Sequence, residues 1–142
     1  MVNLIKLCVG ISSFEQLQSL RRNRLVSVPG MEGLFHVHRT RMRPRRAPEI
    51  VSGQGSLFWV VGGLVCCRQP VMALLATTDE EGRKCCDIVL APQLTRTVPL
   101  PRRPFQGWRY LEQRDAPADL DLGRNGDNNL ELAAELARMG LI

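Results

Sequence analysis

The chain has 142 residues, a length that one hydrophobic core can serve, so a large multidomain enzyme is excluded. An apolar fraction of 44% against 23% charged residues also excludes disorder throughout the chain. The net charge is +5, and the basic side consists of 17 arginines with Lys6 and Lys84 as the only lysines, a ratio that a GC-rich genome can produce without any ligand.

Charge is distributed unevenly along the chain. Residues 1–114 carry a net charge of +9, whereas residues 115–142 carry −4. We therefore predict a basic α+β barrel domain over 1–114, followed by an acidic loop and C-terminal helix over 115–142 that dock on the same domain. A positive field of this kind attracts polyanions, so RNA or another polyanion is the expected partner.

The sequence predicts neither a membrane-spanning segment nor a disulfide framework. Its longest apolar runs fall well short of the ~20 residues that cross a bilayer, and its N-terminus lacks the features of a secretory leader, so we predict a cytoplasmic protein without membrane contact. The five cysteines are odd in number and lack C-x-x-C spacing. We expect them to be small buried hydrophobes, with no metal and no cofactor.

The first half of the chain predicts two strands and two helices. Val2–Val9 is apolar and predicts a first strand. Ser12, with Glu15 three residues later, has the spacing of a capping box and predicts a helix from there to about Leu25. Leu34–Met42 alternates as a strand does, and Pro44 to Ser52 predicts a short helix.

The second half is richer in strands. Ser56–Val61 predicts a buried strand, and Leu64–Thr77 with Lys84–Leu90 predicts a hairpin around the turn Asp79–Gly82, in which Pro70 indicates a break or an edge. The remaining predicted elements are an extended stretch over Pro92–Pro104, a last strand over Gly107–Leu111 and a terminal helix over Leu130–Met139. Together the elements predict an α+β fold: a small mixed β-barrel of five or six strands, with a helix after strand one, a short second helix and a C-terminal helix.

The segment from His36 to Arg46 contains five arginines and no acidic residue. Alternation along a strand would place Arg39, Arg41 and Arg43 on one face at intervals of about 7 Å, a row that could meet successive phosphates. His36 and His38 would share the other face. A solvated basic edge that prevents strand aggregation is the alternative interpretation.

A second stretch interleaves arginines with aromatic rings. Phe105, Trp108 and Tyr110 alternate with basic residues in the way that suits stacking of single-stranded bases and neutralisation of phosphates. Alternatively, Trp59 and Trp108 are core residues of a chain that is short of aromatics. The full set of candidate nucleic-acid contacts is Arg39, Arg41, Arg43, Arg45, Arg46, Arg68, Arg102, Arg103, Trp108 and Arg109.

Five stretches together resemble a bacterial family filed as domain of unknown function 1489. They are Leu4–Gly10, Arg43–Ala47, Gly55–Val60 with Arg68 and Gln69 downstream, Thr78–Gly82 and Pro101–Leu111. The resemblance extends from about residue 2 to 120, and the Pro101–Leu111 stretch is its most specific part. It implies no activity, because that family has none established. The order of elements is also similar to that of PUA-like barrels such as ASCH and EVE domains, which bind RNA or modified bases, a topological analogy alone.

These observations favour a non-enzymatic RNA- or nucleotide-binding domain. A protein-interaction module is the first alternative, in which the arginines dock an acidic partner or the acidic tail of the chain itself. A small hydrolase that acts on a modified nucleobase is the second, with Glu49 or Cys66 beside the arginines. The sequence has no G-x-S-x-G, H-E-x-x-H or Walker A motif, so we expect no enzyme. The oligomeric state stays open.

Overall fold

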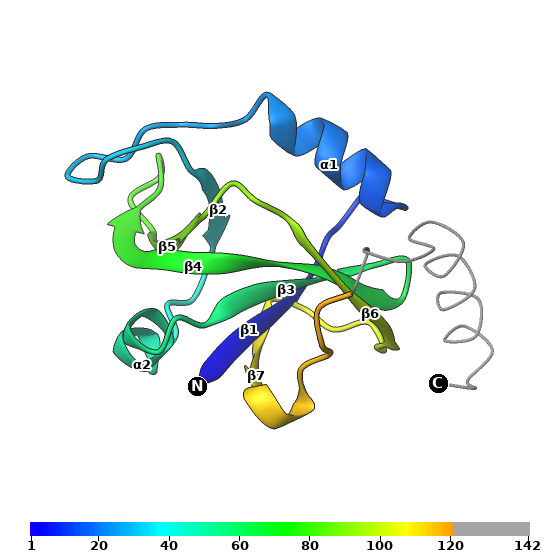
Figure 1. The fold of residues 1–142 in the computed structure, drawn as a ribbon. Coiled ribbons are helices and arrows are strands. Elements are labelled where there is room, and N and C mark those ends of the chain that lie inside the picture. Colours follow the sequence, from blue (N-terminus) through cyan, green and yellow to red (C-terminus); the bar gives the residue numbers. More distant parts are fainter. Residues whose placement is uncertain (121–142) are drawn as a thin grey trace.

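A computed structural model describes residues 1–120, which form one mixed sheet with two α-helices (Figure 1). The elements are β1 (Val2–Leu7), α1 (Phe14–Arg22), β2 (His36–Thr40), α2 (Ala47–Ser52), β3 (Ser56–Val61), β4 (Leu64–Thr78), β5 (Lys84–Leu90), β6 (Thr95–Pro101), β7 (Trp108–Glu112) and a 3₁₀ turn, Gln113–Asp115. The α+β class predicted from the sequence is therefore confirmed. The predicted helix over Leu130–Met139 lies outside the described residues.

The sheet has seven strands in the order β2-β5-β4-β3-β1-β7, with β6 paired to β4 off this path. β1 and β3 are parallel, with Leu4 opposite Leu57, and the other pairings within residues 1–120 are antiparallel. The sheet does not close, so the prediction of a barrel of five or six strands is wrong. The physical reason lies in the Pro92–Pro104 stretch, because part of it pairs with β4 as β6 and adds a strand to the sheet without joining its two ends.

β4 is long enough to pair in two different places. Its first half pairs with β3 and β6, and its second half pairs with β5. Pro70 lies opposite Ser56, where the pairing with β3 ends, and its carbonyl accepts a hydrogen bond from the Ala91 N–H at 3.0 Å. The proline does not interrupt the strand, because its missing N–H falls where β4 changes partners.

Helix α1 begins one residue later than predicted. Ser13, not Ser12, is the N-cap, and its hydroxyl accepts a hydrogen bond from the Gln16 N–H at 3.1 Å. The Gln16 side chain accepts in turn from the Ser12 N–H at 2.9 Å. Glu15 does not cap the helix because its carboxylate pairs with Arg96 at 2.7 Å. The helix also ends at Arg22, before the predicted Leu25.

Both helices pack on the same face of the sheet. Leu17 from α1 and Ile50 from α2 belong to one buried cluster with Leu4, Leu57 and Trp59. Figure 1 shows α2 beside the N-terminal end of β1. The other face carries a smaller buried cluster, which contains Ile5, Phe58, Val60, Val65 and Leu111.

The cysteines agree with their predicted role for the most part. Cys67, Cys85 and Cys86 are buried, whereas Cys8 and Cys66 are half-buried, and all five are free thiols. Separately, among residues 1–120 no helix combines the length and apolar character needed to cross a membrane.

Candidate functional site

Lys6 lies between two tryptophans on one face of the sheet. It is opposite Trp59 of β3 and opposite Trp108 of β7, and residues paired in this way project to the same face. The lysine is half-buried, and burial lowers the pKa of its ammonium group, an effect that Cys8 partly offsets. β1 thus carries, one residue before its end, a cation that is partly removed from water.

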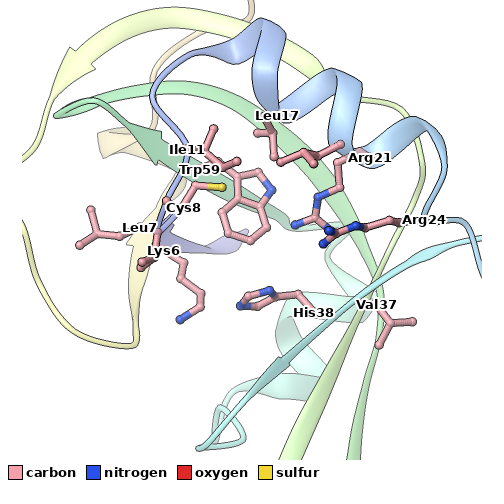
Figure 2. A pocket seen from close by; sticks show the side chains of 13 residues that line it. Lys6, Leu7, Cys8, Ile11, Leu17, Arg21, Arg24, Val37, His38 and Trp59 are labelled. Atoms are coloured by element: carbon pink, nitrogen blue, oxygen red, sulfur yellow. The ribbon is translucent and has the colours of Figure 1, made fainter.

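A cavity of about 510 Å³ opens beside Lys6. Figure 2 shows the Lys6 ammonium, the His38 ring and the guanidinium groups of Arg21 and Arg24 gathered around Trp59. These side chains come from β1, from α1 and the segment after it, and from β2. The remaining lining residues are Leu7, Cys8, Val9, Gly10, Ile11, Leu17, Leu20 and Val37, so the cavity has three cations and no carboxylate in the part of the chain described.

A buried hydrogen-bond network fixes the wall of this cavity. The Trp59 indole N–H donates to the Gln69 side-chain oxygen at 3.0 Å. The Gln69 amide nitrogen lies 2.8 Å from Nδ1 of His36, whose Nε2 lies 2.8 Å from the Arg21 carbonyl oxygen. A neutral His36 protonated on Nε2 satisfies both contacts, because its Nδ1 then accepts and its Nε2 donates. The network therefore links β3, β4 and β2 to the end of α1 that carries Arg21.

Trp59 is a wall of the cavity and not a stacking platform. The Arg21 guanidinium lies 5.1 Å from its ring centre, and the His38 ring meets it edge-on at 5.1 Å and 89°. The indole is only 1% exposed, so no ligand ring can reach its face while Arg21 covers it. Burial lowers the pKa of Arg21, which stays charged in any case.

His38 brings an unpaired buried polar atom to this site. Its Nε2 is buried and has no hydrogen-bond partner among the described residues. Burial, with smaller contributions from Lys6 and Arg21, lowers the pKa of the ring to about 4, so His38 is neutral at pH 7. Buried polar atoms almost always have a partner, and one that lacks a partner calls for an explanation, such as a bound ligand.

Cys8 does not compensate the positive charge. Burial raises the pKa of its thiol, although Arg21 and Lys6 act in the opposite direction. At neutral pH the side chain is an uncharged thiol, not a thiolate. The cavity lining therefore holds three cations without a fixed counter-charge among the described residues.

A second hollow, of about 470 Å³, shares Lys6, Leu7 and Val9 with this cavity. Its other wall is the segment 104–107, which includes Phe105. The guanidinium groups of Arg102 and Arg109 each lie 5.4 Å from the centre of the Phe105 ring. The predicted arginine–aromatic stretch therefore adjoins the cavity through Phe105.

Trp108, the tryptophan of that stretch, packs within the protein and contacts the arginine-rich segment. Its indole N–H donates to the Met42 carbonyl oxygen at 2.7 Å, and its ring meets Tyr110 edge-on at 4.9 Å. The Tyr110 hydroxyl accepts a hydrogen bond from the Arg46 N–H at 3.2 Å. Trp108 and the arginine-rich segment thus contact each other, but neither lines the cavity around Lys6.

The predicted row of arginines on one strand face is not formed. β2 ends at Thr40, so Arg41 and Arg43 follow the strand and do not continue its alternation. Arg43 instead donates to the Leu74 carbonyl oxygen at 3.1 Å. The Trp108–Met42 hydrogen bond, which the sequence does not reveal, holds this segment beside β7. His36 and His38 do lie on the same face of β2, as expected, and Arg39 is exposed on the opposite face.

Three of the candidate arginines form ion pairs within the chain. Arg39 binds Asp87, which lies directly opposite it on β5, through two contacts of 2.8 and 3.2 Å. Arg46 pairs with Glu49 and Glu112, and Arg68 pairs with Asp119. Arg68 also donates a hydrogen bond to the Ser56 hydroxyl at 2.9 Å. Arg41, Arg45, Arg102, Arg103 and Arg109 form no ion pair with any residue of the described part.

The residues proposed for a hydrolase do not converge. Glu49 is engaged by Arg46 at 2.7 Å, and the Cys66 thiol lies 3.6 Å from the Cys67 sulfur. Neither side chain lines the cavity around Lys6. A third hollow, of about 360 Å³, does contain an arginine with an acid, Arg68 with Asp119. The ion pair lowers the pKa of that carboxyl, which keeps it ionised and unsuited to donate a proton at neutral pH.

Sequence reasoning missed most of this site. In the sequence, the helix dipole alone accounts for Arg21 and Arg24 near a helix C-terminus, and Lys6 stands out only because it interrupts an apolar run. The interruption was the available signal, because a cation in a strand that is otherwise buried has to face water, an acid or an anion. Its juxtaposition with His38 and Trp59 depends on strand pairings that no local pattern reveals.

Comparison with known proteins gives one match. The model of a family described as "Protein of unknown function (DUF1489)" matches residues 4–142, nearly the whole chain, and the protein belongs to this family. The predicted resemblance is thereby confirmed. No curated protein and no solved structure matches the chain.

Proposed function

We propose that the protein is a non-enzymatic nucleic-acid-binding domain, for RNA or nucleotides, that holds phosphate at the cavity lined by Lys6, Arg21 and Arg24. The observation that carries the proposal is the lining itself, with three cations and no carboxylate among the described residues. Such an arrangement is self-repulsive when the cavity is empty, and an anionic ligand relieves the repulsion. The lowered pKa of Lys6 is consistent with a cation that lacks a partner.

The hollow beside the cavity favours a nucleic acid over a simple anion. Phe105 is half-buried there, and Arg102 and Arg109 lie near its ring. A base can contact the exposed part of this ring while the arginines beside it contact the backbone. This combination of aromatic and basic side chains is how proteins hold single strands without sequence preference. Arg103 is exposed in the same segment and adds to the local positive charge.

The ion-paired arginines contribute less to this proposal than the sequence suggested. Arg39, Arg46 and Arg68 each have a carboxylate within 2.8 Å. A phosphate would have to compete with that carboxylate, so we expect little affinity from these three residues. We therefore place the main phosphate contact at the Lys6 cavity and not at these three residues.

Fluorescence anisotropy of the full chain with a labelled single strand of about eight nucleotides tests the proposal. Binding should be tighter than ~100 μM at low salt and should weaken steeply as salt is raised, because bound phosphates release counterions. Arg24→Gln should weaken binding about three- to tenfold and lower the salt slope by about one, as expected for one lost phosphate contact.

Arg39→Gln is the matched control, because it removes an exposed arginine that Asp87 already neutralises. It should change affinity less than about twofold. Absence of binding, or equal losses for the two variants, would contradict the proposal. Binding of an acidic peptide in preference to RNA would instead favour the protein-interaction alternative.

A further inference from the structure

We propose that the Lys6 cavity receives a terminal phosphate, a phosphomonoester, and does not bind the internal phosphodiesters of a strand. The inference rests on the proposed function and assigns the chemical group that this site takes. The monoester could belong to the end of an RNA or to a mononucleotide, and both present the same group.

The charge of the lining matches a dianion better than a monoanion. Lys6, Arg21 and Arg24 bring three positive charges to one cavity. A phosphomonoester carries about −1.5 to −2 at pH 7, because its second ionisation has a pKa near 6, whereas a diester carries only one charge. The monoester therefore neutralises more of the repulsion among the three cations.

The number of cations around the cavity also favours a chain end. Its cations approach from separate segments, β1, α1 and the residues after α1, and Figure 2 shows them around the buried Trp59 ring that forms the wall. Ile11 and Leu17 add apolar surface to the lining. A monoester presents three terminal oxygens to these three cations. An internal diester presents only two, because its other two oxygens are bonded to sugar carbons.

His38 supplies the remaining contact. Its ring is neutral at pH 7, and its buried Nε2 has no partner among the described residues. If the proton is on Nε2, this atom donates to a phosphate oxygen without adding a fourth positive charge. Lys6 and Arg21, the charged groups nearest to the ring from β1 and α1, are the groups that hold the phosphate in this arrangement.

The second hollow gives the rest of the ligand a place to lie. Because it shares Lys6 with the cavity, a nucleotide whose phosphate is bound by Lys6 can extend toward Phe105. The site then binds one end group and its first nucleotide, and the next nucleotides project into solvent.

The test compares one short RNA sequence in three forms: with hydroxyls at both ends, with a 5′-phosphate and with a 3′-phosphate. Adenosine 5′-monophosphate and adenosine form a second pair, and binding is measured by calorimetry with the full chain. One phosphorylated RNA should bind at least about tenfold more tightly than the unphosphorylated form. If the monophosphate shows the same gain over adenosine, the site recognises a free nucleotide as well.

Three variants assign the gain to the cavity. Lys6→Gln, Arg24→Gln and His38→Phe should each reduce the gain from phosphorylation, and Arg39→Gln should preserve it. Circular dichroism shows whether each variant is folded, and Arg24→Gln, an exposed position, keeps the test valid if a buried variant is not. If the RNA binds equally with and without end phosphates, the inference is overturned while the proposed function stands. If none of the ligands binds, both are overturned.

Discussion

The side-chain oxygen of Gln69 accepts the indole N–H of Trp59 at 3.0 Å, and both side chains are almost fully buried, at 0% and 1% exposure. The same glutamine donates to the Ala91 carbonyl oxygen at 2.9 Å and contacts His36 at 2.8 Å. One side chain thus satisfies polar groups from three neighbouring segments. The position of the cavity wall depends on it, because Trp59 would otherwise have a buried donor without an acceptor.

Replacing Gln69 by leucine should therefore destabilise the fold. The variant leaves the Trp59 indole N–H and Nδ1 of His36 buried without their partner, and each such group costs about 1–3 kcal/mol. We expect a loss of about 2–4 kcal/mol in the free energy of unfolding, measured by urea denaturation. Gln93→Leu, at an exposed position, is the control and should change stability by less than about 0.5 kcal/mol. Equal effects of the two substitutions would argue against the network.

His38 should make stability depend on pH in the mildly acidic range. Its pKa is about 4 in the folded protein against an ordinary value of 6.5, so on acidification the unfolded chain takes up the proton first. The stabilisation is complete above pH 6.5 and is lost as the pH falls toward 4, by up to about 3 kcal/mol.

The variant His38→Phe isolates this contribution. Urea unfolding at several values between pH 7 and 4 should give a flatter stability curve for the variant than for the wild type. A backbone hydrogen bond and then Arg96 lower the pKa of Glu15, and Arg68 lowers the pKa of Asp119. These carboxylates are present in both proteins and cancel in the comparison. Parallel curves would show that His38 does not carry the effect.

Gly55 is required because of a close backbone approach. A Cβ at this position would lie 2.2 Å from the Val2 carbonyl oxygen and 3.2 Å from Ile50. Since the nearest atom belongs to the backbone of β1, the sheet itself must shift, and Gly55→Ala should cost more than about 2 kcal/mol. Gly63→Ala meets no atom within 4 Å and should cost only about 1 kcal/mol for its positive φ. Thermal unfolding of the two variants measures the difference, and a smaller loss for Gly55→Ala would contradict the packing argument.

The Arg68–Asp119 ion pair should hold the segment after β7 against the sheet. Beside it, the Val98 N–H donates to the Ala118 carbonyl oxygen and the Leu120 N–H to that of Arg96, both at 2.8 Å. Arg68→Ala should therefore speed hydrogen exchange at the amides of Val98 and Leu120, with little change elsewhere in the sheet. Arg114→Ala, whose exposed side chain forms only a 3.8 Å contact, is the control. Unchanged exchange at both amides in Arg68→Ala would show that the backbone bonds alone hold the segment.

The local elements could be predicted because neighbouring residues decide them. Proline and serine signals located both helices to within a few residues, and the Asp79–Gly82 turn located the β4–β5 hairpin, where Asp79 accepts hydrogen bonds from the N–H groups of Glu81 and Arg83 at 2.9 Å. The observed helix boundaries differ from the predicted ones where a side chain binds a partner far away in the sequence. Glu15 binds Arg96, 81 residues away, and does not form the predicted capping contact.

By itself the sequence determined the α+β class, the family and the excess of basic residues over 1–114, since composition and local pattern carry these. Tertiary structure alone decided which arginines are neutralised and which face a cavity. Arg39 has its counter-charge on β5 and Lys6 has none in the cavity lining, because strand pairing between distant segments selects the neighbours of each charge. A run of charges in a sequence does not show which acidic side chain will lie beside each basic one. The pairing of the seven strands of the open sheet decides that.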